Sequence, residues 1–187
     1  MGVAFAMEPP IAAPVDDQAL IAASQAGDGQ AFGELVRRYE RAVYNLALRT
    51  LQDRTEAEDA AQEAFFKAYR AIATFRPGAK FSTWIFTICY RGCCDRLAKR
   101  KRFSGEELPD HADPSAGPGD LAERDDEARR LRAAIDGLPE KYRTVITLFH
   151  LQEKQYEEIA TVLNLPLGTV KTHLFRAKEL LRKALAS

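Results

Sequence analysis

Apolar side chains recur along this chain at spacings of three and four residues, which is the period of an amphipathic helix. No stretch of useful length shows the alternation expected of a strand. The pattern predicts helices over about 17–26, 28–51, 55–76 and 81–101 in the first half, and over 139–151, 155–163 and 166–185 in the second. The predicted fold class is therefore all-α.

Residues with known roles at helix ends mark several of these boundaries. Gly27 can end the first helix, and Asp28 can cap the second. Thr55 and Glu58 have the spacing of a capping box at the start of the third. Asn164 stands between two short helices, where the turn needs a residue that tolerates a positive φ. These signals predict where the helices begin and end.

The chain divides into two helical parts at a stretch that cannot form a core. Residues 103–127 hold nine acidic side chains against one arginine, and prolines and glycines are frequent among them. Such a composition predicts a flexible acidic linker. We expect two small domains, a four-helix amino-terminal bundle and a carboxy-terminal helix-turn-helix. The predicted segments are a disordered leader over 1–15, the bundle over 16–102, the linker over 103–127 and the helix-turn-helix domain over 128–187.

The formal net charge is zero because two basic regions offset the acidic linker. Residues 91–102 contain six basic side chains and one acidic, and residues 168–187 contain five and one. Runs of basic residues usually lie on solvent-exposed faces, but these two regions also suit the binding of phosphates. No apolar run approaches the roughly 20 residues of a membrane helix. The leader lacks the basic start of a signal peptide, so we expect a cytoplasmic protein without direct membrane insertion.

The three cysteines, Cys89, Cys93 and Cys94, lie in one short stretch without regular disulfide spacing, which indicates a reducing compartment. Cys89 and Cys93 share a helical face and could begin a metal site, but no histidine stands nearby to complete a tetrahedral set. The alternative, which we expect, is that they are buried structural thiols. We predict no metal, no cofactor and no small-molecule substrate.

The segment 156–176 has the pattern of a helix-turn-helix. The inner stripe of its second helix consists of Val170, Leu174, Ala177 and Leu181. The opposite face presents the residues that we expect to contact duplex DNA, which are Lys171, Thr172, Phe175 and Arg176. Arginine can bridge guanine acceptors in the major groove, and an apolar side chain can touch a thymine methyl. A three-helix bundle with a solvated outer face is the alternative, but an exposed phenylalanine among basic residues argues against it.

Longer motifs resemble the sigma factors of the sigma-70 family. Those similar to its fourth conserved region, which binds the minus-thirty-five promoter element, are Leu138-Pro139, Arg143, 156–160 (YEEIA) and 167–177 (LGTVKTHLFRA). Those similar to its second conserved region are Phe32, Tyr39, 58–65 (EDAAQEAF), Phe75-Arg76 and 81–85 (FSTWI). The two modules occur without the first and third regions of large sigma factors. The chain is therefore similar to the small extracytoplasmic-function group.

The resemblance implies a function and partners. The chain would bind core RNA polymerase, recognise the minus-ten and minus-thirty-five elements of promoter DNA and assist promoter melting. An anti-sigma factor would hold it inactive. The acidic helix around Asp59, Gln62 and Glu63 would dock on clamp helices of the largest polymerase subunit, although a solvated acidic face gives the same pattern. We also expect the isolated chain to bind promoter DNA weakly, because its acidic and basic parts can satisfy each other.

The resemblance also implies contacts to the minus-ten element and the melted strand. The loop 76–80 would hold a flipped base, although on its own it is a Pro-Gly turn. Trp84 would lie close to the melted strand and equally suits the core. The residues expected to make these contacts are Arg76, Lys80, Trp84, Arg91, Arg96, Lys99 and Arg100. Arg91 stands where the family often has an asparagine that helps recognise the minus-ten sequence.

Two other functions fit parts of the sequence. A free-standing dimeric regulator would explain the helix-turn-helix, but such proteins usually carry a sensor or receiver domain with strands. A recombinase with a carboxy-terminal helix-turn-helix would need a nucleophilic serine in a strand-containing domain. Ser24, Ser82 and Ser104 have no such setting. We therefore expect no enzymatic activity.

Overall fold

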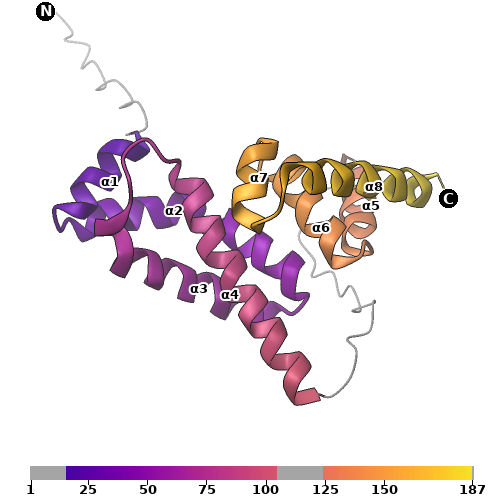
Figure 1. Cartoon of the computed structure of the whole chain (residues 1–187), viewed down its shortest axis with the longest axis horizontal. Coiled ribbons are helices and arrows are strands. Elements are labelled where there is room, and N and C mark those ends of the chain that lie inside the picture. Colours follow the sequence, from indigo (N-terminus) through magenta and orange to yellow (C-terminus); the bar gives the residue numbers. More distant parts are fainter. Residues whose placement is uncertain (1–15, 105–123, 187) are drawn as a thin grey trace, which may run out of the picture.

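The computed structural model describes residues 16–104 and 124–186, and every regular element within them is a helix (Figure 1). The predicted all-α class is confirmed. The elements are α1 (Asp17–Gln25), α2 (Gly29–Leu51), α3 (Arg54–Ala71), the 3-10 turn η1 (Ile72–Thr74), α4 (Phe81–Ser104), α5 (Arg124–Asp136), α6 (Glu140–Ile146), the π-helical turn η2 (Thr147–Leu151), α7 (Tyr156–Leu163) and α8 (Leu167–Leu185). The predicted leader and residues 105–123 of the predicted linker lie outside the described residues.

The first four helices form a bundle around one apolar core. Its largest fully buried side chains are Leu35, Val43, Leu46, Phe81, Ile85 and Phe86. Helix α3 contributes mainly small residues, and its alanines at 57, 60, 61, 64 and 68 are buried. Small side chains let α3 approach α2 and α4 closely. Phe65 of α3 and Ile72 of η1 are buried on the same side of the bundle as these alanines.

The helix ends in this bundle follow local chemistry, with one difference from the prediction. Asp28 caps α2 as predicted, because its carboxylate accepts hydrogen bonds from the Gln30 and Ala31 amides. The predicted capping box at Thr55 is wrong. Asp53 is the N-cap of α3 and accepts from the Glu56 amide at 2.9 Å. Because Asp53 has extended backbone and a suitable carboxylate, the N-cap of α3 lies two residues earlier than expected.

The second part contains α5 to α8 around a core that includes Ile135, Val145, Ile159, Val170 and Leu174. The chain between α7 and α8 turns at Asn164, whose φ of 53° lies in the left-handed region as predicted. Helix α5 was not predicted, and its first residues fall in the range expected to be linker. The predicted helix over 139–151 is α6 followed by the π-helical turn η2.

The two parts are in contact (Figure 1). Helix α4 packs on α7, and α2 packs on α6. At the end of α2, the Arg143 guanidinium donates to the Arg49 carbonyl at 2.6 Å, and Gln52 donates to the Asp136 carbonyl at 3.0 Å. Arg49 also pairs with the Asp136 carboxylate. Within 16–104 and 124–186, no helix is both long and apolar enough to cross a lipid bilayer.

Candidate nucleic-acid interface

The side chains predicted to contact duplex DNA all lie on the outer face of α8. Lys171, Thr172, Phe175 and Arg176 are exposed, whereas the stripe on the opposite side is buried against the rest of the second part, as predicted. The Thr172 hydroxyl donates to the Gly168 carbonyl at 2.9 Å. The Arg176 guanidinium pairs with Glu179 at 2.9 Å, one turn further along the same face. The face therefore presents two cations, a hydroxyl and an aromatic ring to solvent.

Phe175 is the unusual member of this face. Its side chain is 60% exposed. Leaving such a ring in water instead of burying it forgoes roughly 1.5–3 kcal/mol. An exposed aromatic residue between a lysine and an arginine suits a surface that becomes covered by a partner with both charged and apolar groups. The edge of a DNA major groove has both.

His173 packs against a neighbouring aromatic side chain. Its ring lies edge-on to Tyr142, with centroids 5.4 Å apart. Burial lowers the pKa of His173, and nearby Lys141 lowers it further. The imidazole is therefore held neutral beside the buried stripe of α8.

The second predicted DNA surface is the turn before α4 and the start of that helix. Arg76 and Lys80 are exposed in the turn, and Gly78 has a φ of +83°, a conformation that favours glycine. Trp84 is half-buried, with its ring 5.1 Å from Phe75 and 5.8 Å from Phe81. The indole thus packs on the bundle core and keeps part of its surface in solvent.

The basic end of α4 holds the remaining predicted cations in two environments. Arg91, Lys99 and Arg100 are exposed. Arg96 instead bridges to α3, with its guanidinium 3.0 Å from Glu56 and 2.8 Å from Glu63. Burial tends to lower the pKa of Arg96, but the two carboxylates raise it overall. A residue predicted to bind DNA is therefore paired with one predicted to bind polymerase.

The residues predicted to bind polymerase are exposed on α3. They are Asp59, Gln62 and Glu63. Hydrogen bonds from Lys67 and then from Arg96 lower the pKa of Glu63, so its carboxylate is held in the charged form. Asp59 lies one turn before Glu63 on the same helix. Asp59 and Glu63 thus form an anionic edge along α3, with the neutral amide of Gln62 beside them.

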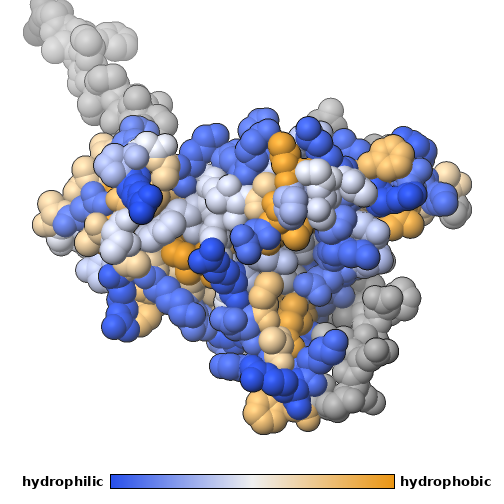
Figure 2. Space-filling model, in the orientation of Figure 1, coloured by the Kyte–Doolittle hydropathy of each residue, from blue (hydrophilic) through white to orange (hydrophobic). Residues whose placement is uncertain are grey.

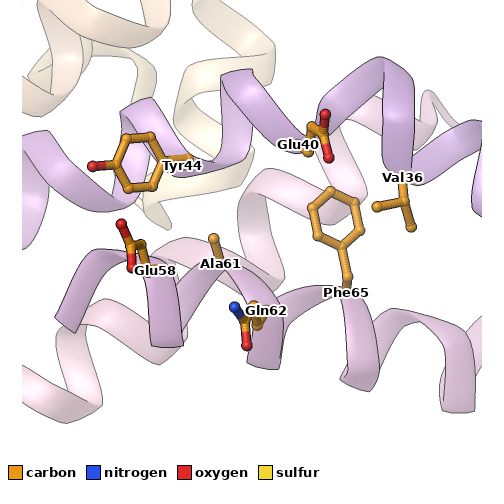
Figure 3. A pocket seen from close by; sticks show the side chains of 7 residues that line it. All are labelled: Val36, Glu40, Tyr44, Glu58, Ala61, Gln62 and Phe65. Atoms are coloured by element: carbon orange, nitrogen blue, oxygen red, sulfur yellow. The ribbon is translucent and has the colours of Figure 1, made fainter. Parts of the chain in front are cut away.

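A groove runs between α2 and α3 beside this edge (Figure 3). Its walls are formed by Val36, Glu40 and Tyr44 from α2 and by Glu58, Ala61, Gln62 and Phe65 from α3. Figure 3 shows the α2 side chains facing those of α3 across the groove. Sequence reasoning missed the α2 wall. Its signal was present, since residues 36, 40 and 44 recur every four residues on one helical face.

The exposed surface is largely hydrophilic on the face shown in Figure 2, and separate apolar patches interrupt it. The large apolar side chains that are exposed are Phe66, Tyr69, Phe103, Leu131, Phe175 and Leu185. Cys89 and Cys93, in contrast, are fully buried, as expected for structural thiols. The described part of the chain contains no cluster of three or more histidine, cysteine or acidic side chains able to hold a metal ion.

Comparison with known sequences identifies both parts. The profile of Sigma-70 region 2 matches residues 35–103, and that of Sigma-70, region 4 matches residues 128–181. The RNA polymerase sigma-H factor of Pseudomonas aeruginosa is 37% identical over 180 residues, which cover 90% of this chain and 93% of that protein. The ECF RNA polymerase sigma factor SigW of Bacillus subtilis is 39% identical over 170 residues, covering 85% and 91%.

Two solved structures have a similar fold. CnrH in complex with the cytosolic domain of CnrY superposes with a TM-score of 0.66 at 26% identity, covering 91% of this chain and 97% of that one. The sigma factor RpoE of Bartonella quintana, in complex with the anti-sigma factor NepR, gives a TM-score of 0.69 at 24% identity, covering 83% and 96%. Because RpoE is only 24% identical to this chain, its likeness shows a shared fold alone.

Proposed function

We propose a residue-level mechanism for this chain, which belongs to the extracytoplasmic-function (ECF) sigma factors of the sigma-70 family. As an RNA polymerase sigma factor it acts in transcription initiation through promoter recognition. The proposal assigns the upstream element to α8, the downstream element to α4 and the turn before it, and polymerase binding to α3. The two parts, expected over 16–102 and 128–187, act as domains that are tethered by the segment between the end of α4 at Ser104 and the start of α5 at Arg124.

Helix α8 binds the minus-thirty-five element in the major groove. Arg176 contacts a base edge, Phe175 contacts a thymine methyl, and Lys171 and Thr172 contact phosphates and set the register. The observation that supports this assignment is the division of α8 into a buried stripe and an exposed face with these four side chains. Arg176 must leave Glu179 when it binds, and an exposed pair of this kind is weak enough to break.

The start of α4 binds the melted minus-ten strand. Separating the strands costs about 1.4 kcal/mol per base-pair step in lost stacking. A pocket that traps an extruded base and cations that pair with phosphates can offset this cost. Arg76 and Lys80 flank the turn, Trp84 lies beside it, and Lys99 and Arg100 extend the cationic surface along α4. Arg91, in place of the family's usual asparagine, contributes charge and stacking, and it alters the sequence preference at one downstream position.

Helix α3 binds the clamp helices of the polymerase through Asp59, Gln62 and Glu63. The groove beside them extends this surface with an apolar floor and an acidic rim, a combination that fits a basic, partly apolar helix. Core polymerase supplies the catalysis, and we propose no enzymatic activity for this chain. It acts in the cytoplasm, where core polymerase is available, and it is held inactive by an anti-sigma factor, as the similarly folded RpoE is bound by NepR.

Reconstituted holoenzyme tests this division of roles. Permanganate footprinting detects melted thymines, and filter binding at low temperature detects the initial duplex complex. We expect Arg76→Ala with Lys80→Ala to reduce melting and leave initial binding largely intact, and Arg176→Ala to reduce initial binding. Arg37→Ala, an exposed arginine on α2, is the control for loss of positive charge. Equal loss of both signals in the two variants would contradict the assignment.

A further inference from the structure

The start of α7, with the residues just before it, is fixed to the start of α4 and the end of the preceding turn by a cluster of polar contacts. The Lys154 ammonium donates to the Ser82 hydroxyl at 2.5 Å. One oxygen of Glu158 accepts from the Thr83 hydroxyl at 2.9 Å and lies 3.3 Å from the Lys80 ammonium. Lys154 and Glu158 are 4.0 Å apart. The cluster therefore joins the helix-turn-helix to the surface that we assign to the melted strand.

These contacts are sheltered from solvent. The side chains of Lys154 and Glu158 are only 11% and 15% exposed, and Lys154 also lies over the Phe86 ring. Charged side chains are rarely buried to this degree without partners. Burial alone would raise the pKa of Glu158, but its hydrogen bonds from the Gln155 amide and Thr83, together with nearby Lys154, lower that pKa overall. Glu158 is thus held as a carboxylate against α4.

The surroundings of Glu158 are those of a bound phosphate. An anionic oxygen accepts from a hydroxyl and pairs with an ammonium, as a DNA phosphate does when serine, threonine and lysine contact it. Lys80 is one of the residues that we assign to the downstream element. While Glu158 remains in place, a strand phosphate cannot occupy the same position beside Lys80 and Thr83.

The closed arrangement also cannot span a promoter. The two elements lie about 25 base pairs apart, or about 85 Å along a duplex at about 3.4 Å per base pair. Helix α8 has 19 residues and directly follows α7, so at about 1.5 Å per residue it extends only about 28 Å from the contact with α4. The two DNA surfaces cannot reach both elements unless α7 leaves α4.

We infer that the free chain is autoinhibited, with Glu158 occupying a phosphate position on the downstream DNA surface until the two parts separate. This inference rests on the proposed function, because the start of α4 is a target of inhibition only if it binds DNA. Single-strand phosphates then compete with Glu158 for Lys80 and Thr83. The contacts at the end of α2, through Arg143 and Arg49, hold the same arrangement at a second place.

Energy transfer in the free, full-length protein tests the closed state without DNA. Dyes are attached to cysteines introduced at exposed Ala79 and Thr161, which lie beside Lys80 and one turn beyond Glu158, with Cys94 replaced by serine, since Cys89 and Cys93 are buried. We expect one high-transfer population. Lys154→Glu places two carboxylates together and, near a helix N-terminus, leaves α7 itself intact. It should lower the ratio of closed to open molecules by about tenfold or more.

Single-stranded DNA binding by the same free protein tests the competition. Glu158→Gln removes the negative charge, and glutamine can still serve in the capping box of α7. Glu157→Gln makes the same change in net charge at an exposed neighbour and is the matched control. We expect Glu158→Gln to tighten binding of a labelled oligothymidine severalfold more than Glu157→Gln does.

The outcomes separate this inference from the proposed function. Low energy transfer in the unmodified protein, or equal DNA affinities of the two glutamine variants, would overturn autoinhibition and leave the holoenzyme roles untouched. Normal promoter melting by Arg76→Ala with Lys80→Ala would instead overturn the assigned downstream surface. Two results together support the inference. Energy transfer is high in the unmodified protein and falls in Lys154→Glu, and Glu158→Gln tightens oligothymidine binding more than Glu157→Gln does.

Discussion

Replacing Arg176 by alanine removes the guanidinium that we assign to a base edge in the upstream element. In the free protein this side chain is 60% exposed and paired only with Glu179, which is itself 37% exposed. Such a pair contributes at most about 1 kcal/mol, so the fold should be unaffected. A bidentate contact from arginine to a base is worth about 1–3 kcal/mol. We therefore expect the holoenzyme to bind its promoter about 5- to 150-fold more weakly.

The assay is holoenzyme binding to a promoter and to variants with each base of the upstream element changed in turn. We expect Arg176→Ala to lose discrimination at one base and to retain it elsewhere. The matched control is Arg37→Ala. Arg37 is exposed to a similar degree, 66%, and pairs with a glutamate three residues away in the same manner, but it lies on α2. It should leave the base preferences unchanged.

Two results would refute the reasoning about Arg176. One is a uniform loss of affinity across all upstream sequences, together with a slope of log affinity against log salt concentration that is smaller by about one. This result would mark a phosphate contact. An affinity equal to that of Arg37→Ala would remove Arg176 from the interface altogether.

Further predictions concern stability. Arg143→Met removes the hydrogen bonds of a buried guanidinium to three backbone carbonyls; it should lower the free energy of unfolding by about 3 kcal/mol and the urea midpoint in far-UV circular dichroism by about 1.5 M. A midpoint change within error would contradict this. Asp28→Ala removes the cap of α2 and should cost about 1 kcal/mol, seen as a melting temperature about 2–4 °C lower, whereas Asp16→Ala, where the side chain makes no capping bond, should change little. The pKa of Glu158 is lower in the folded chain than its ordinary value of 4.5, so its contribution is present above pH 4.5 and is lost as the pH falls through the lower folded pKa. Unfolding free energy measured from pH 7 to 3 should therefore fall less steeply in Glu158→Gln, and parallel curves would refute this.

Local and periodic features of the fold could be predicted from the sequence. The buried stripe of α8 follows from the spacing of apolar residues, and the left-handed turn at Asn164 follows from the residue type. The capping residue of α3 was predicted as Thr55, and the structure has Asp53 instead. Asp53 and Thr55 are both good caps, and only the conformation after α2 decides between them.

Two other elements could not be predicted from the spacing of apolar residues. Helix α5 is dominated by charged residues, and its clearest apolar anchor is Ile135, which is fully buried. One anchor near the end of a segment does not establish a helical period. The π-helical turn after α6 continues the same apolar pattern as an α-helix, so the pattern could not reveal it.

The candidate site also has features that could be predicted from the sequence and features that could not. Exposure of the α8 face could be predicted, because it is the complement of a buried stripe. The pairing of Arg96 with Glu56 and Glu63 joins residues 40 and 33 positions apart, and the contact of Glu158 with Thr83 joins residues 75 apart. Helical periodicity gives no information about such pairs, because they depend on how whole helices pack.

The most direct test of the account is transcription by core polymerase, with and without this chain, from a library in which the distance between the two promoter elements is varied. We predict initiation only when the chain is added, with both elements required and one spacing strongly preferred. Initiation that tolerates half a helical turn of added spacing, or tight promoter binding by the chain alone at physiological salt, would contradict the claim that both parts bind one promoter while held by the polymerase.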